Sequence, residues 1–199
     1  MNTFKQSKFF ITREFEITET HLNYRVLKYG NETELKIPFE NLREKTSFRN
    51  LNIEFLFIAG FFGLLASLSV FWKMEDETID SGMIFFFGSV SIGFLLYFII
   101  GRVNQWRIRL SNNQYVFINK KNPSQSQTED FINAIYEAQK EYLRSNYLII
   151  DSRLNYENQV ETLKWLKSLN AISQEEYKQK YEELRKLILP EKRTIGFEK

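Results

Sequence analysis

Two long apolar stretches, residues 55–72 and 82–100, constrain this chain more than any other feature of its sequence. Neither stretch contains a charged residue, and each approaches the length at which a helix rising about 1.5 Å per residue crosses a hydrocarbon layer of about 30 Å. The acidic loop between them, which contains Glu75 to Glu77, is too short for both helices to cross in the same direction. We therefore expect a transmembrane hairpin at residues 51–101, with helices at about 53–72 and 81–101 and an outside loop at 73–80.

The charges that flank the two stretches predict the orientation of the hairpin. Short loops that are rich in Lys and Arg stay in the cytoplasm, whereas the connecting loop is acidic. We expect a multi-pass protein of a bacterial inner membrane with both termini in the cytoplasm. The basic residues expected at the membrane interface are Arg43, Lys45, Arg49, Arg102, Arg107 and Arg109. They either determine the topology alone or also contact anionic lipid headgroups. A soluble protein with a buried helical hairpin is the alternative interpretation.

Small residues recur at one-turn spacing inside both apolar stretches. Close approach of helix backbones in lipid depends on such residues, because no water is expelled to drive the contact. The candidates for helix packing are Ala59, Gly63 and Ser67 in the first stretch and Ser89 and Gly93 in the second. We expect them to join the two helices of one hairpin, with contact between copies as the alternative. The serines could also line a polar path in an oligomer.

The segments on either side of the hairpin show the period of two that is typical of half-buried strands. It extends over residues 14–39, and it resumes at residues 105–110 and 115–118. Neither half has enough strands to bury a sheet alone, so we expect residues 1–50 and 102–148 to pair into one small antiparallel sheet. Residues 39–50 are expected to form a short amphipathic helix or a loop. A helix over about 128–147, with Thr128 as its N-cap, is expected to cover the sheet, which makes the chain an α+β protein.

This pattern of strands followed by a closing helix resembles the bacterial pleckstrin-homology-like domains found on membrane proteins. The resemblance rests on the strand run Phe15–Phe39, the strands Trp106–Leu110 and Tyr115–Ile118, and the helix start Thr128–Ile135. It implies a cytoplasmic PH-like domain with the membrane hairpin inserted in it. The chain departs from the family in two ways, because only about five strands are clear where the family has seven and because the hairpin interrupts the domain.

Residues 156–189 read as two short helices around the break at 170–173. Ser173 and Glu176 fit a capping box at the start of the second helix, and Pro190 is expected to end it. The run Leu163–Leu184 resembles the short C-terminal helical hairpin known as SHOCT, although Asn170-Ala171 stands where that family commonly has Gly. The resemblance implies oligomerisation or partner binding, for which the candidate residues are Leu163, Leu166, Tyr177, Tyr181 and Leu184. The alternative is a hairpin that packs on its own domain.

The composition argues against catalysis. The chain has no Cys and a single His, and its formal charge of +2 does not indicate a nucleic-acid binder. No glycine-rich phosphate loop or nucleophile–base motif is present in the sequence. We therefore expect no enzyme, with no catalytic residue, cofactor or metal site.

These features together predict a non-enzymatic adaptor or scaffold that is anchored in the lipid bilayer and presents a cytoplasmic interaction domain. It would bind a protein partner or further copies of itself. The first alternative is an oligomeric pore-forming or membrane-disrupting effector gated by its cytoplasmic domain, for example in antiphage defence. An accessory subunit of a transporter is a second alternative.

Overall fold

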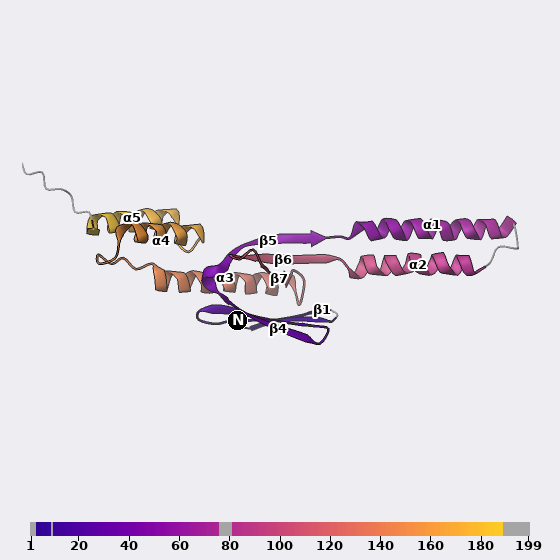
Figure 1. Cartoon of the computed structure of the whole chain (residues 1–199), viewed down its shortest axis with the longest axis horizontal. Coiled ribbons are helices and arrows are strands. Elements are labelled where there is room, and N and C mark those ends of the chain that lie inside the picture. Colours follow the sequence, from indigo (N-terminus) through magenta and orange to yellow (C-terminus); the bar gives the residue numbers. More distant parts are fainter. Residues whose placement is uncertain (1–2, 9, 76–80, 189–199) are drawn as a thin grey trace, which may run out of the picture. The chain divides into compact units, whose positions relative to one another are not determined.

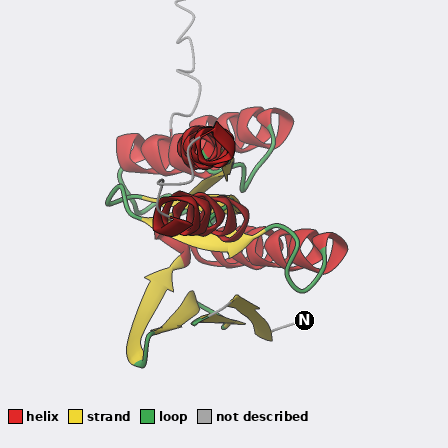
Figure 2. Ribbon diagram, turned by 90° about the vertical axis from the view of Figure 1, so that its right-hand side faces the viewer, coloured by secondary structure: helices red, strands yellow, loops and turns green. Residues whose placement is uncertain are grey.

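The computed structural model describes residues 3–8, 10–75 and 81–188 of the 199-residue chain. The described residues form an α+β protein with antiparallel strands and five α-helices (Figures 1 and 2). In chain order the elements are β1 (Thr3–Lys8), β2 (Ile11–Ile17), β3 (His21–Lys28), β4 (Asn31–Pro38), the 3₁₀ turn η1 (Phe39–Asn41), β5 (Leu42–Asn50), α1 (Ile53–Glu75), α2 (Ser81–Ile100), β6 (Val103–Leu110), β7 (Tyr115–Asn119), α3 (Gln125–Tyr147), α4 (Tyr156–Ser168) and α5 (Gln174–Ile188).

The chain divides into two compact units. The first unit comprises residues 1–46 and 106–199, and the second comprises residues 47–105. The boundary falls inside β5 and β6, so the second unit is an insertion in the sequence of the first.

The strands form two sheets, which corrects the expectation of a single one. The first sheet is the meander β1-β2-β3-β4, in which Phe4 lies opposite Phe15 and Phe15 lies opposite Tyr24. The second sheet has the order β5-β6-β7. The two halves of the chain therefore do pair with each other, but only through β5, whose neighbour is β6.

Two of the seven described strands, β1 and β5, were not predicted from the alternation of apolar and polar residues. The alternation in β1 is obscured because its second buried residue is the polar Gln6, whose side chain bonds both backbone groups of Asn119. Residues 39–50 were expected to form a helix or loop, and this expectation is wrong beyond the short η1 turn. The strand β5 lies at a sheet edge and buries only Leu42. Its stability therefore comes from backbone pairing, which produces no alternation of apolar and polar side chains in the sequence.

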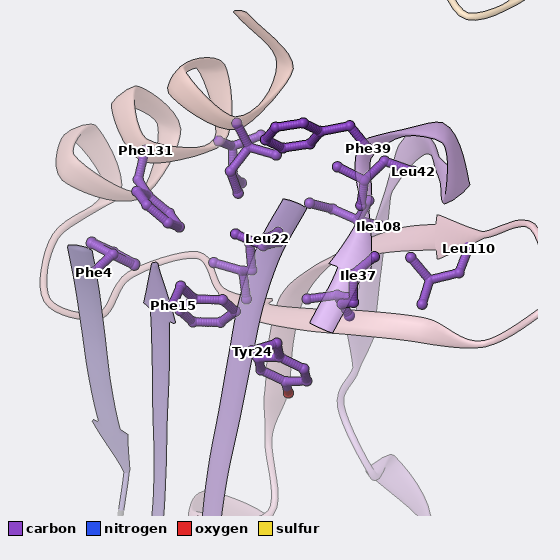
Figure 3. Packing of buried hydrophobic residues seen from close by; sticks show 14 residues of the cluster. Phe4, Phe15, Leu22, Tyr24, Ile37, Phe39, Leu42, Ile108, Leu110 and Phe131 are labelled. Carbon is purple, nitrogen blue, oxygen red and sulfur yellow. The ribbon is translucent and has the colours of Figure 1, made fainter. Parts of the chain in front are cut away.

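The helix α3 lies over the main hydrophobic core. Phe131 stacks on Phe4 with ring centroids 4.5 Å apart and lies 5.7 Å from the ring of Phe15 (Figure 3). The core contains Phe4, Phe15, Leu22, Tyr24, Ile37, Phe39, Leu42, Ile108, Leu110, Val116, Ile118, Phe131, Ile132 and Ile135. All of these residues belong to the first unit, so its core is closed without the insertion.

The N-cap of α3 is Ser124 and not Thr128. The Ser124 hydroxyl accepts a hydrogen bond from the backbone N–H of Gln127, and the helix begins at Gln125. Thr128 is buried inside the helix, where its hydroxyl donates to the Ser124 carbonyl. The Ser-x-x-Gln spacing of residues 124 and 127 is itself a capping-box signal, hidden in a polar run that resembles a loop.

The helices α4 and α5 form a second hydrophobic cluster with the end of α3. Its buried members are Leu143, Leu163, Leu166, Ala171, Ile172 and Leu184. The predicted capping box is confirmed, because the Ser173 N–H donates to Glu176 and the Glu176 N–H donates to the Ser173 hydroxyl, each over 3.1 Å. Asn170 takes the left-handed conformation, with φ 56°, in the turn between the helices. Pro190 lies outside the described residues.

The second unit contains α1 and α2, which are long and apolar enough to cross a membrane. Of the most apolar 18-residue stretch of each helix, only 11% is buried in α1 and only 6% in α2. The helices contact each other along a line in which residues 55, 59, 62, 66 and 69 of α1 are buried or half-buried, a spacing of alternating three and four residues. Of the expected outside loop, residues 76–80 lie outside the described part.

Candidate functional site

The helices α1 and α2 contact each other at Ala59 and Gly63. Ala59 is 2% exposed, and its carbonyl accepts a hydrogen bond of 2.8 Å from the Ser91 hydroxyl. A Cβ at Gly63 would lie 3.3 Å from the same Ser91 oxygen. Both residues therefore lie in the contact between the two helices, and their partner on α2 is Ser91.

The other three residues of the predicted packing stripe lie on exposed sides of the helices. Ser67 and Ser89 donate to carbonyls of their own helices, those of Gly63 and Phe86. A Cβ at Gly93 would meet no atom within 4 Å. The buried and half-buried positions of α2 include 84, 87, 91, 94 and 98, a heptad spacing that turns residues 89 and 93 away from α1. Phe stands at 87, 94 and 98 on this face, but aromatic residues also stand at the exposed positions 85, 86 and 97, so the aromatic residues did not mark the face in the sequence.

Two of the predicted interface arginines are bound within the first unit. A guanidinium nitrogen of Arg43 donates to the carbonyls of Glu40 and Leu42, over 2.6 and 3.1 Å. Arg109 donates to the side-chain oxygen of Asn113 over 2.7 Å. Both arginines therefore have a structural role at the strand ends, whether or not they also meet lipid.

A second pair of predicted basic residues lies over aromatic rings of the second sheet. The Lys45 ammonium is 5.2 Å from the centroid of Trp106, and the guanidinium of Arg107 is 5.4 Å from that of Phe117. Lys120 was not among the predicted residues, and its ammonium lies 4.0 Å from the same Trp106 ring. The structure thus gathers two lysines around one indole at the point where the chain leaves and re-enters the first unit.

The remaining two basic residues belong to the second unit. The Arg102 guanidinium lies 4.2 Å from the ring centroid of Phe98, and Arg49 is exposed near the end of β5. Each follows or precedes an apolar helix by a few residues, as an interfacial cation does.

Three of the five candidate partner-binding residues are buried inside the chain itself. Leu163, Leu166 and Leu184 are members of the second hydrophobic cluster. Tyr177 and Tyr181 are half-buried, and their rings stack at 6.1 Å. In this conformation α4 and α5 pack on α3, so a partner would meet the tyrosine pair and not the leucines.

An ion pair joins the C-terminal hairpin to α3. Arg144 contacts both carboxylate oxygens of Glu176, with distances of 2.9 and 2.6 Å. The hydrogen bond from Arg144, followed by that from the Ser173 backbone, lowers the pKa of Glu176 to about 2. The same contact raises the pKa of Arg144, so both groups are charged at neutral pH.

A second polar contact joins α3 to the η1 turn. Tyr142 and Tyr147 each donate a hydrogen bond of 2.8 Å to the same carboxylate oxygen of Glu40. Desolvation opposes ionisation of Glu40, but its own backbone amide and the two hydroxyls outweigh it and lower the pKa. The hydrogen bond to Glu40 raises the pKa of Tyr147 to about 12.

A cleft of about 780 Å³ lies between the β5–β6 edge, α3 and the turn after α4. Its charged lining is mixed, with Arg43, Arg109 and Lys140 set against Glu44 and Glu137. The Tyr136 hydroxyl donates to the Arg43 carbonyl, and burial raises the pKa of Tyr136. The lining residues suit binding of a polar group and contain no nucleophile–base pair.

Within the described ranges, no group of three or more His, Cys, Asp or Glu side chains could hold a metal ion. Comparisons with protein-family models, with curated proteins and with solved structures gave no match.

Proposed function

We propose that this chain is a non-enzymatic, membrane-anchored adaptor that presents its first unit as an interaction domain on the cytoplasmic side. The observation that carries the proposal is the exposed apolar surface of α1 and α2. Core helices of a soluble protein are mostly buried, whereas these two helices expose side chains such as Phe57, Phe85 and Ile92 at 61% or more of their surface. Lipid is the solvent that satisfies such a surface.

The proposed orientation places both termini in the cytoplasm of a bacterial inner membrane. Its support is the distribution of charge, because the predicted interface cations flank the helices and the connecting loop is acidic. The first unit, built from both flanking segments, then lies entirely on the cytoplasmic side.

The resemblances to PH-like domains and to SHOCT hairpins are part of the same proposal. The seven described strands with the closing helix α3 agree with the family's strand number better than the five that were clear from the sequence. The confirmed capping box supports the SHOCT-like pattern. Neither resemblance identifies the partner, for which the half-buried Tyr177 and Tyr181 are the proposed contacts.

The structure favours the adaptor over the pore-forming alternative at one point. A polar path needs hydroxyl groups that face the lumen, but Ser67, Ser69 and Ser89 each donate to a carbonyl of their own helix. Their hydroxyl hydrogens are therefore bonded within the helices and are not available to line a pore.

The first experiment tests membrane insertion. The full chain, expressed in a bacterium, should remain in the membrane pellet after alkaline carbonate washing and should require detergent for release. A periplasm-active reporter inserted near residue 77 should be active, and the same reporter at either terminus should not be. Release by carbonate, or a cytoplasmic position for residue 77, would overturn the proposal.

The second experiment separates adaptor from pore. Induced expression should leave the membrane potential unchanged when it is followed with a potential-sensitive dye. A rapid depolarisation that depends on the amount of protein would favour the pore-forming effector. The Tyr177→Ala/Tyr181→Ala variant should lose a partner captured by in-cell cross-linking, whereas Leu154→Ala, also exposed in the first unit, should retain it.

A further inference from the structure

Two exposed aromatic side chains meet at one end of the first sheet. Phe10 lies in the β1–β2 turn and Tyr29 in the β3–β4 turn, and they are 73% and 71% exposed. The Tyr29 N–H donates to the Phe10 carbonyl over 3.3 Å, and the two rings stack at 5.9 Å. We call this pair the aromatic tip. The pair lies outside the core, so its exposed apolar area is available for a contact outside the chain.

The surroundings of the aromatic tip are cationic. The Lys28 ammonium lies 5.8 Å from the Tyr29 ring, and Lys8 is exposed at the end of β1. Two carboxylates of the neighbouring strands, those of Glu14 and Glu32, form ion pairs with Lys5 and Arg25. Tyr and Trp favour the headgroup level of membranes, and Lys residues are attracted to anionic lipid there.

Within the first unit, the aromatic tip follows strand β1, whose Gln6 side chain bonds the end of β7. The Gln6 side chain of β1 donates to the Asn119 carbonyl at the end of β7 over 2.8 Å. The next residue, Lys120, lies over Trp106, where the chain re-enters the first unit. Phe10 follows Gln6 by four residues along the chain.

We propose that the aromatic tip is a lipid-contact site, in which Phe10 and Tyr29 enter the headgroup layer of an anionic membrane and the adjacent lysines bind its phosphates. This inference rests on the proposed membrane location and adds a third attachment point to the two helices. It also moves lipid recognition from the predicted arginines, of which Arg43 and Arg109 are bound within the protein, to two aromatic residues that were not among the predicted site residues.

The absence of cysteine from the sequence makes a site-specific test possible. Full-length Phe10→Cys is labelled with a polarity-sensitive fluorophore and reconstituted into vesicles of phosphatidylcholine with about 30% phosphatidylglycerol, or of phosphatidylcholine alone. Tyr29→Cys is a second probe of the aromatic tip. Leu154→Cys is the matched control, because Leu154 is an exposed apolar residue of the same unit in the α3–α4 connection.

At positions 10 and 29 the label should be quenched by headgroup-level nitroxide lipid at least twofold more than at position 154. The difference should shrink in vesicles without phosphatidylglycerol and in the Lys28→Glu background. Equal quenching at all three positions would overturn the lipid-contact site, and strong protection of positions 10 and 29 that appears only with a cytosolic extract would point to a protein instead. Retention on vesicles after carbonate washing is scored in the same samples, so failure of membrane anchoring is distinguished from failure of the aromatic tip.

Discussion

At the scale of single residues, Glu176 has two structural tasks. It closes the capping box of α5 by accepting from the Ser173 N–H, and it pairs with Arg144 of α3. The first task was readable from the spacing of Ser173 and Glu176, because capping is local. The second depends on how α3 and α5 approach each other over 32 residues of sequence, and no local pattern carries that information.

Glu176→Gln should loosen the C-terminal hairpin without removing the cap, because the glutamine carbonyl can still accept from Ser173. Both partners of the ion pair are about one-third exposed, so we expect the hairpin to lose only about 0.5–1 kcal/mol of stability. This loss corresponds to about a two- to fivefold rise in the rate of hydrogen exchange of α4 and α5. Exchange of the full-length protein in detergent measures this by mass spectrometry. The control is Glu175→Gln, the same charge change at the exposed neighbouring position. Equal effects of the two variants would show that the ion pair contributes nothing specific.

The same pair predicts a pH dependence. The pKa of Glu176 is lowered from 4.5 to about 2 in the folded state, so the unfolded state binds the proton more tightly. The stabilisation is therefore complete above pH 4.5 and is lost as the pH falls from 4.5 towards 2. Thermal unfolding of the wild type and of Glu176→Gln in detergent, followed by circular dichroism, should differ at pH 7 and converge near pH 2. Because Glu40 titrates in both proteins, only their difference reports on Glu176. A difference that is independent of pH would exclude the ion pair as its source.

At the scale of elements, the buried face of a helix or strand was predictable where that element packs one side on the large hydrophobic core. The apolar face of α3 and the strands β2, β3, β6 and β7 follow their hydrophobic period, because each packs one side on the core. The strand β5 could not be recognised, since a mostly polar edge strand is held by backbone hydrogen bonds. The packing face of α2 was misassigned because both helices are apolar all round, so polarity gave no guide to the side that faces the partner helix.

Gly63→Leu should separate α1 from α2, because even a Cβ at this position lies within 3.3 Å of the Ser91 hydroxyl. We expect the variant to lose about 1–3 kcal/mol of stability, as overpacked helix contacts do. Gly60→Leu is the matched control on the same helix, since a Cβ there meets no atom within 4 Å. The temperature at which half of the protein leaves the monodisperse gel-filtration peak in detergent measures the effect. Adding Ser91→Gly should restore part of the loss, and a lack of rescue would mean that the clash is not with Ser91.

At the scale of the whole molecule, the insertion of one unit within the other was expected from the sequence, while the division of the strands into two sheets was not. The alternating pattern reports which residues of a strand are buried, but it does not report which strands are neighbours. The neighbour of β5 is β6, which lies on the other side of the insertion in the chain. The division of the strands into two sheets could therefore be recognised only from the strand pairing in the structure.

The first unit should fold without the insertion. Its core contains no residue from 47–105, and β5 and β6 lie side by side, with a bond from the Thr46 hydroxyl to the Arg107 carbonyl. Replacing residues 47–105 by a two-residue Asn-Gly turn should therefore close β5 and β6 into a hairpin and yield a folded protein that needs no detergent. We expect monodisperse gel filtration in buffer, helix and strand signals in circular dichroism, and cooperative unfolding.

The control for this deletion is the same shortened chain with Phe131→Ala, which removes the ring between Phe4 and Phe15 and should cost about 3–5 kcal/mol. Aggregation of the shortened chain itself would mean that α1 and α2 cover part of the first unit, as core helices of a soluble protein would. Solubility would mean that the apolar surface of the full chain resides in the insertion alone, which is the physical requirement for a membrane anchor that leaves the cytoplasmic domain intact.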